Sequence, residues 1–482
     1  MTIIMEQNTQ PEVFIRGMGS AIPGIGDPRI HNGHGGTLVQ VSDVCEYLVK
    51  EFDIHNPKTG KRVDREWAKR NMGVDTISCG RLDFVKKELA TKEYVETLLT
   101  DDMKPVLEQE LGYIAFEEAL ERSNLKASDV DAILLASVTL HDLWGWESMR
   151  QWKLRFPDLK DDVQMEHHPL GCPAFLIELK RARQMLCSPE IRNVAIVVSN
   201  GGTNDVNREY MKAHGADNDM KKWINTALFG DGAGVCIVSS DTRNLPEMVF
   251  DVVDVEYRRN FDTNVATMEV KAVESEDGEM TTTPVFQLDF GAAKHFKGAL
   301  EHWRKVLKKK HNMTFKKADH VSLHTPNPNV LDMVAKWYGI TKKVSYLPRK
   351  VGNLAPASVV TNMYDRLHGE GSKIENGDNI LGFAFGDALG IIDGIFLLKA
   401  RTIQTDDDIS TVASSCMSPD VKSSVMKRVL FKTWGAKKNG TSPNKSRSIF
   451  SKRTNKKVCD VGLSDRAGSS QSNEGGVHTG KR

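Results

Sequence analysis

Apolar and polar positions along the chain change between two patterns. Between Ile15 and Ala400, short apolar runs alternate with stretches in which apolar residues recur at helical spacing. This alternation is typical of an α/β protein with a mainly parallel sheet. We expect strands at residues 13–20, 130–138, 193–200, 233–240, 249–257, 320–325, 379–385 and 393–400.

The order of these elements repeats within the chain. In the first half, a helix ending in SNLKASDVD leads to a strand around Ile133, and two later strands flank FGDGAG. In the second half, a helix ending in HNMTFKKADH leads to a strand at Val321, and two later strands flank FGDALG. A chain of 482 residues exceeds the usual size of one core. We therefore interpret residues 1–240 and 241–400 as two copies of one layered unit.

Residues 401–482 differ in composition from the rest of the chain. They contain 16 Lys and Arg against 7 Asp and Glu, and Ser, Gly and Asn are frequent. Such a segment cannot bury enough apolar surface to fold, so we expect a basic, mostly disordered tail. Val421, Val425 and Val429 recur at helical spacing among basic residues, which leaves a basic amphipathic helix as an alternative to a solvated tail.

Overall composition is that of a soluble globular protein. The chain is 40% hydrophobic and 27% charged with a formal net charge of +1, which does not indicate a nucleic-acid partner. The seven cysteines are scattered without a C-x-x-C pair, which favours a reducing compartment over a disulfide framework or a zinc site. The N-terminus resembles neither a signal nor a transit peptide, and no apolar run is long enough to span a membrane.

One cysteine stands where chemistry is expected. Cys172 directly precedes a stretch in which apolar residues follow helical spacing, and Pro173 suits the first position of a helix. The partial positive charge and unpaired N–H groups of a helix N-terminus favour the nucleophilic thiolate and can stabilise an oxyanion. The alternative is that Cys172 is a small buried apolar residue.

A histidine and an asparagine in the second half are further candidates. His324 follows an apolar strand, and open α/β sheets bind ligands at the carboxyl ends of their strands. Asn353 lies in a Gly-Asn turn before a helix. Two neutral donors on one thioester carbonyl can stabilise an enolate. Alternatively, His324 only ends a strand and Asn353 only caps a helix.

The three residues together resemble the β-ketoacyl-acyl-carrier-protein synthase III branch of the thiolase superfamily. GCPAF at 171–175 is similar to the A-C-x-G-F context of that family's cysteine, and HTPN at 324–327 is similar to its H-Q-A-N motif. GNLAPAS at 352–358 is similar to its G-N-T-S-A-A-S motif. FGDGAG at 229–234 is a further hallmark, which the family resemblance interprets as a tight turn between two core strands.

The resemblance implies a thiolase fold with two similar βαβαβ-type halves in a five-layered αβαβα arrangement. It implies that Cys172 carries an acyl group, and that His324 and Asn353 donate to the malonyl thioester oxygen during decarboxylative condensation. The N–H of Cys172 and one from the Gly386 turn would form the oxyanion hole. It further implies a homodimer in bacterial cytoplasm or plastid stroma, with acyl-CoA or acyl-carrier-protein thioesters as substrates. No metal and no permanently bound cofactor are expected.

The chain departs from the family pattern at several positions. Pro173 stands where the family has a small residue, and Ala174 where it usually has Gly. Pro328 with Asn329 stands where the family has a carrier-protein docking arginine. His167 and His168 precede the cysteine, and residues 24–39 look like an added loop. These departures leave a second hypothesis open, in which the chain is a catalytically silent thiolase-like subunit that binds an acyl chain or a partner.

Overall fold

The computed structural model describes most of the first 403 residues. The described residues are 11–25, 37–42, 60, 66, 70, 73–79, 107–137, 146–168, 170–201, 228–260, 266–274, 280–288, 292–324, 327–369, 373–387 and 391–403. Met1–Ile409 form one compact unit, and Ser410–Arg482 a second one that lies wholly outside the described residues. The predicted tail, its valine-spaced helix and most of the predicted added loop are therefore not described, and the predicted bounds of the halves stay predictions.

Nine strands form the main sheet of the described part, and eight of them were predicted. Its order is β11-β12-β13-β8-β1-β7-β6-β4-β5. The strands are β1 (Phe14–Ala21), β4 (Ala132–Ser137), β5 (Gln164–His168), β6 (Asn193–Gly201), β7 (Asp231–Ser239), β8 (Met248–Asn260), β11 (His320–Leu323), β12 (Asn379–Asp387) and β13 (Ile391–Thr402).

Strand pairing repeats in the two halves of this sheet. In the first half, β4 runs parallel to β6, and β6, β7 and β1 follow antiparallel. In the second half, β11 runs parallel to β12, and β12, β13 and β8 follow antiparallel. Five of the eight strand pairings in the main sheet are antiparallel, so the prediction of a mainly parallel sheet is wrong. A parallel bridge between Val321 and Val344 matches the parallel pairing of β4 with β5. The two halves meet where β1 pairs with β8, and the expected repeat of one unit is visible in the hydrogen bonding.

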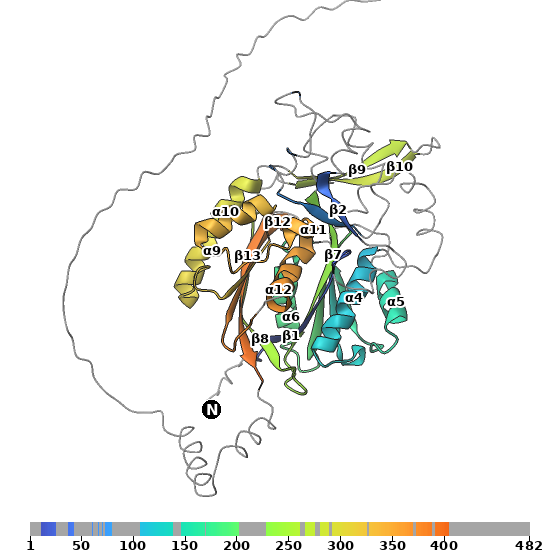
Figure 1. Cartoon of the computed structure of the whole chain (residues 1–482). Coiled ribbons are helices and arrows are strands. Elements are labelled where there is room, and N and C mark those ends of the chain that lie inside the picture. Colours follow the sequence, from blue (N-terminus) through green and yellow to red (C-terminus); the bar gives the residue numbers. More distant parts are fainter. Residues whose placement is uncertain are drawn as a thin grey trace, which may run out of the picture. The chain divides into compact units, whose positions relative to one another are not determined.

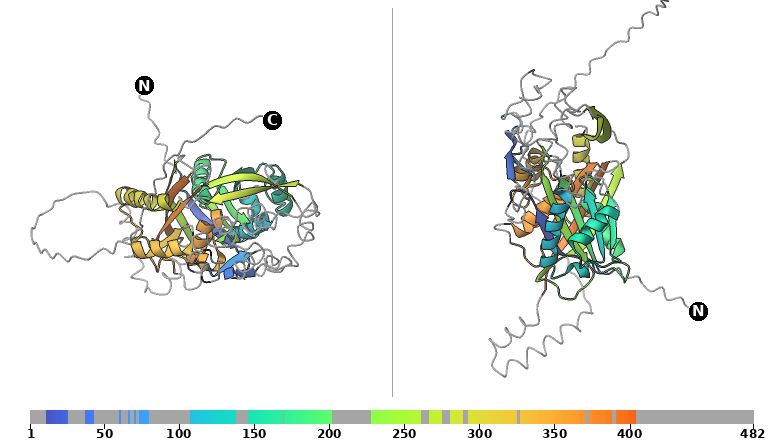
Figure 2. Two further views of the ribbon diagram at one scale, coloured as in Figure 1. Left: turned by 90° about the horizontal axis from the view of Figure 1, so that it is seen from above. Right: turned by 90° about the vertical axis from the view of Figure 1, so that its right-hand side faces the viewer.

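Helices cover the strands in separate layers (Figures 1 and 2). The central cluster contains apolar residues of α6 (Ala174–Met185) and α12 (Ser358–His368) together with strands of both halves. A second cluster packs α4 (Leu107–Arg122) and α5 (Trp146–Arg155) on the first half. A third packs α9 (Ala292–His311) and α10 (Pro328–Tyr338) on the second half. Helices outside, strands, and helices inside give the five-layered α/β fold that the sequence predicted.

The remaining described elements are short. They are the strand pair β2 (Thr37–Gln40) and β3 (Thr76–Cys79), the hairpin β9 (Ala266–Glu274) and β10 (Met280–Leu288), helix α11 (Pro348–Val351), and the 3₁₀ turns η3 (Ala127–Asp129) and η4 (Ala355–Ala357). These four strands and β5 were not predicted from the sequence. A search for apolar runs does not find them, because they contain polar residues at alternate or clustered positions and β10 contains Pro284.

One predicted turn is wrong. FGDGAG does not turn tightly between two core strands, because β6 ends at Gly201 and β7 begins only at Asp231. The motif instead leads into β7, where a Cβ on Gly230 would lie 2.0 Å from the Val351 carbonyl oxygen. Glycine is therefore needed for close backbone approach. Pro173 is also shifted by one position, since it caps α6 rather than opening it.

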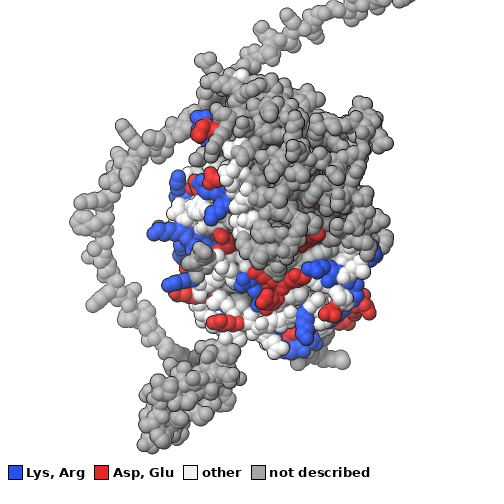
Figure 3. Space-filling view, turned by 45° about the vertical axis from the view of Figure 1, so that its right-hand side comes forward, with Lys and Arg blue, Asp and Glu red and all other residues white. Residues whose placement is uncertain are grey.

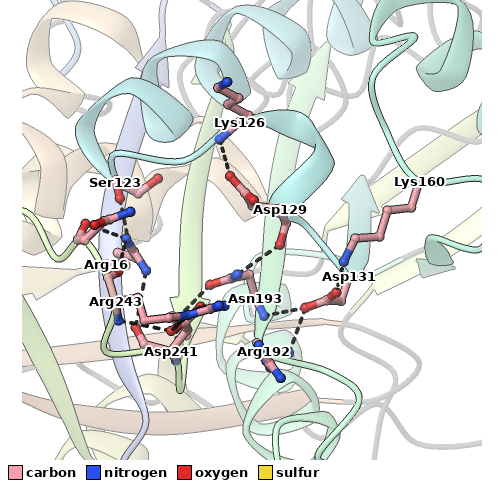
Figure 4. A network of polar contacts seen from close by, with 12 residues as sticks. Arg16, Ser123, Lys126, Asp129, Asp131, Lys160, Arg192, Asn193, Asp241 and Arg243 are labelled. Carbon is pink, nitrogen blue, oxygen red and sulfur yellow. Dashed lines mark hydrogen bonds and ion pairs between the residues drawn. The ribbon is translucent and has the colours of Figure 1, made fainter.

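A polar network closes the end of the first half where β4 and β6 begin (Figure 4). Arg16 of β1 is 1% exposed, and its guanidinium donates to the backbone carbonyls of Ser123, Asp241, Arg243 and Asn244 at 2.6–3.2 Å. The Asp131 carboxylate accepts from the backbone N–H groups of Arg192 and Asn193. The charged groups of Arg16 and Asp131 therefore bond to the backbone of the protein itself. The candidate catalytic residues lie at the opposite ends of the strands.

The surface shows no single sign of charge on the face drawn in Figure 3, where Lys and Arg stand among Asp and Glu. Within the described ranges, no helix has the length and apolar character that a membrane crossing requires.

Candidate active site

Cys172 lies in the turn between β5 and the central helix α6. The backbone N–H of Ala174 donates to the Gly171 carbonyl at 2.9 Å, which fixes a tight turn around the cysteine. The predicted helix begins directly after this turn, and Phe175, Leu176, Leu179 and Ala182 are buried as expected. Cys172 itself is half-buried and forms no disulfide. Cys172 therefore lies at the start of a helix whose apolar side is buried in the core.

Gly386 lies directly against Cys172. A Cβ built on Gly386 would stand 2.6 Å from Cys172 Cβ and 3.4 Å from its Sγ. Any side chain at this position would displace the cysteine, so only glycine permits the observed contact. Gly386 belongs to the last part of β12, and the two halves of the fold therefore meet at Cys172.

His324 follows β11 at the same edge of the sheet as Gly386. Its backbone N–H donates to the Phe383 carbonyl of β12 at 2.9 Å, three residues before Gly386. The side chain is 3% exposed, and its Nδ1 has no hydrogen-bond partner among the described residues. Burial lowers the pKa of His324 to about 4, so the imidazole is neutral at physiological pH. A neutral imidazole carries one N–H donor.

Asn353 is held by backbone and side-chain contacts. Its N–H donates to Leu228, and its carbonyl accepts from Gly230 at the start of the FGDGAG motif. Its Oδ1 accepts from the Ala355 N–H at 2.9 Å and the Ser358 hydroxyl at 3.1 Å. These two bonds fix the orientation of the Asn353 amide.

Helix α12 links Asn353 to the strand that carries His324. Ser358, which supports Asn353, opens this helix. One turn later, the Asn362 amide donates to the Leu323 carbonyl at 3.1 Å. Ser322 of β11 in turn donates to Val359 at 2.8 Å. The donor residues of the second half are thereby fixed on one rigid support.

Among departures from the family pattern, Asn329 has a structural role. Its amide donates to the Arg70 carbonyl at 2.9 Å, and it packs closely on Gly73, whose φ of +68° favours glycine. The Asn329 side chain therefore makes contacts within the protein itself.

Two features near the site were not predicted. Ser358 orients Asn353, a role that its place five residues later in the motif does not reveal. Glu178 lies fully buried on α6 and bonds to His168. A charged residue on the apolar face of a helix was the available signal. No group of three or more His, Cys, Asp or Glu side chains within the described residues is arranged to hold a metal ion.

Comparison with known proteins agrees with this architecture. The chain is 29% identical over 289 residues to the β-ketoacyl-[acyl-carrier-protein] synthase III of Synechocystis sp., covering 58% of this chain and 80% of that protein. It is 25% identical over 285 residues to the enzyme of the same name from Trichodesmium erythraeum, covering 56% and 78%. No protein-family model matches the chain.

Solved structures share the fold. The 3-oxoacyl-[acyl-carrier-protein] synthase III of Aquifex aeolicus superposes with a TM-score of 0.55 at 19% identity, covering 80% of this chain and 99% of that one. The type III polyketide synthase domain of Steely1 from Dictyostelium gives a TM-score of 0.60 at 17% identity, covering 81% and 100%. By sequence the chain is thus similar to β-ketoacyl-[acyl-carrier-protein] synthase III enzymes, and by structure it has the fold of these synthases.

Proposed function

We propose that this protein forms a carbon–carbon bond by decarboxylative Claisen condensation of an acyl thioester with a malonyl thioester. Cys172 is the nucleophile, and His324 and Asn353 are the donors. The observation that carries the proposal is the contact of Cys172 with Gly386, next to the strand end that holds His324. A nucleophile from one half thus faces the donor edge of the other.

The first step is acyl transfer. The Cys172 thiolate attacks the carbonyl of an acyl thioester, and the carrier thiol leaves with a proton. The negative oxygen of the tetrahedral intermediate needs donors fixed in place beforehand. We assign these to the backbone N–H groups of Cys172 and Gly386, because the two residues are in contact.

The second step is condensation. A malonyl thioester loses carbon dioxide, and the electron pair of the broken bond forms an enolate whose carbon attacks the acyl-cysteine. The Cys172 thiolate then leaves as the β-ketoacyl thioester forms. The neutral His324 suits this step, since an imidazolium would hold the enolate as a salt, whereas a neutral N–H and the Asn353 amide stabilise it transiently.

Acyl-CoA is the acyl donor we favour. The position at which the family carries a docking arginine is Asn329, and its amide is engaged with the Arg70 carbonyl. Carrier-protein docking through this contact is therefore lost, although an acyl carrier protein stays an alternative donor. We expect no permanently bound cofactor, because neither step transfers electrons to a third group.

A homodimer in a bacterial cytoplasm or plastid stroma remains part of the proposal. Within the described residues, β5 is the outer strand of the sheet and pairs on one side with β4. Its other edge can pair with a second copy. Mass measurement of the native protein tests this expectation.

Radiolabelled acyl-CoA tests the nucleophile. The intact protein should retain label after denaturation, and the Cys172→Ser variant should not. Cys187→Ser is the matched control, because Cys187 is exposed near the other end of α6. Equal labelling of Cys172→Ser and the intact protein would remove the proposal. Acylation without release of carbon dioxide from a malonyl thioester would show an acyltransferase instead, and absence of both reactions would favour the silent-subunit hypothesis.

A further inference from the structure

The apolar side of the central helix α6 carries one carboxylate. Glu178 lies among Phe175, Leu179 and Ala182, all of which are buried, and its own side chain is 0% exposed. Charged residues are almost never fully buried unless paired. This carboxylate has no part in the condensation described above, and it stands six residues after Cys172 in the chain.

Glu178 is bonded to the end of strand β5. Its Oε1 lies 2.8 Å from Nδ1 of His168, while its Oε2 has no partner among the described residues. His168 also lies 3.6 Å from Glu166, which pairs with Arg181 of α6 at the half-exposed rim. Two contacts therefore join β5 to α6, one that reaches from the half-exposed His168 to the buried Glu178 and one near solvent.

The contact between His168 and Glu178 spans the segment that contains Cys172. His168 ends β5 and α6 begins at Ala174, so Cys172 lies in the short connection between them. We propose that Glu178 is a positioning residue for Cys172, which it fixes by tying His168 to α6 behind the loop. This inference rests on the proposed role of Cys172.

Stability does not explain a glutamate at this place. Removing a carboxylate from water costs free energy, and a buried ion pair can usually be replaced by apolar residues without loss of stability. Burial raises the pKa of Glu178, and the bond to that carboxylate raises the pKa of His168. Both directions favour the protonated forms of the two groups, with Glu166 and Arg181 as neighbouring charges. A costly contact of this kind is expected where it serves function.

The position of Cys172 tolerates little error. The cysteine lies against Gly386 so closely that a single added carbon would overlap with it. A displacement of about 1 Å at a reacting group can lower a rate by roughly 100-fold. A loose connection between β5 and α6 would permit such a displacement.

Three variants test the proposal in the full-length protein. Glu178→Leu removes the bond to His168 and keeps a buried apolar side chain of similar size. Glu178→Gln removes the charge but keeps an oxygen that accepts from Nδ1. Arg181→Met is the matched control, because it breaks only the outer pair between the same two elements. We measure kcat and KM for acylation by acyl-CoA, the thermal midpoint, and the pH dependence of Cys172 alkylation by iodoacetamide.

We expect Glu178→Leu to lower kcat by about 10- to 100-fold with little change in KM or thermal midpoint. Glu178→Gln should restore kcat to within about threefold of the unaltered protein, and Arg181→Met should leave it unchanged. The alkylation profile of Cys172 should shift only in Glu178→Leu. Unaltered kcat in Glu178→Leu, or an equal loss in Glu178→Gln, would overturn the proposal.

If Glu178→Leu does not fold, His168→Leu decides the question from the other end of the contact. We expect the same loss of kcat, and unaltered kcat would overturn the proposal. Failure of the proposed function is recognised separately, because Cys172→Ser would then retain acyl label irrespective of any change at Glu178.

Discussion

The buried, neutral state of His324 leads to a measurable pH dependence of stability. In the unfolded chain the imidazole titrates near its ordinary value of 6.5, whereas in the folded protein its pKa is about 4. As pH falls below 6.5, the unfolded state therefore binds a proton that the folded state does not accept. The folded protein loses stability through this window, until His324 is protonated in both states near pH 4.

The size of the effect follows from the two pKa values. Linkage between them gives a loss of about 2 kcal/mol between pH 7 and pH 5, and of about 3 kcal/mol by pH 4. Replacement His324→Gln removes this titrating group. We therefore expect urea unfolding of the variant to lose about 2 kcal/mol less than the unaltered protein between pH 7 and pH 5.

A control and a second probe make the test specific. His295→Gln, which replaces an exposed histidine at the start of α9, is the matched control for the substitution. Carbon-13 labelling of the histidine rings should show a ring that stays neutral down to about pH 5 and is absent in His324→Gln, while the ring of His368, whose pKa burial also lowers to about 4, stays neutral in both proteins. Equal pH slopes for the unaltered protein and His324→Gln, or titration of that ring near 6.5, would refute the reasoning.

Other substitutions test the remaining contacts. Gly386→Ala places a Cβ 2.6 Å from Cys172 Cβ, so acylation should fall about 100-fold, whereas Gly298→Ala on α9, where nothing lies within 4 Å, should stabilise the protein by about 0.5–1 kcal/mol in urea. Arg16→Leu leaves four backbone carbonyls without their donor and should lower the free energy of unfolding by roughly 3–5 kcal/mol. Asn353→Asp keeps an acceptor for its two bonds but loses the amide donor, so carbon dioxide release should fall by at least about 100-fold while labelling of Cys172 persists.

The elements that the sequence predicted are those with a simple hydrophobic signal. Core strands such as β6 and β13 are buried along nearly their whole length, and their apolar runs are visible without a structure. The repeat of two halves also followed from element order. Strand β5 was missed because four of its five residues, QMEHH, are polar. Its formation depends on pairing with β4, which no local pattern encodes.

Site geometry was less accessible from the sequence. The motifs predict Cys172, His324 and Asn353 as site residues, but the contact between Gly386 and Cys172 joins residues more than 200 positions apart. The second bond that fixes the Asn353 amide comes from Ser358, which only the folded turn brings near. Glu178 was not singled out, because a helical pattern alone does not distinguish an exposed carboxylate from one that is fully buried.

The repeated fold gives a physical reason why three distant residues can serve one reaction. Gly171-Cys172 precedes the central helix α6, and Gly352-Asn353 precedes α12, the central helix of the other half. His324 follows β11, which takes in the second half the place that β4 has in the first. The residue after β4 is Val138, whose side chain cannot donate a hydrogen bond. Two identical halves would present either two nucleophiles or two sets of donors. In neither case would an acylated cysteine meet a stabilised enolate at one site. The proposed chemistry thus depends on divergence at matching positions of the repeat, with the proposed nucleophile in one copy and both proposed donors in the other.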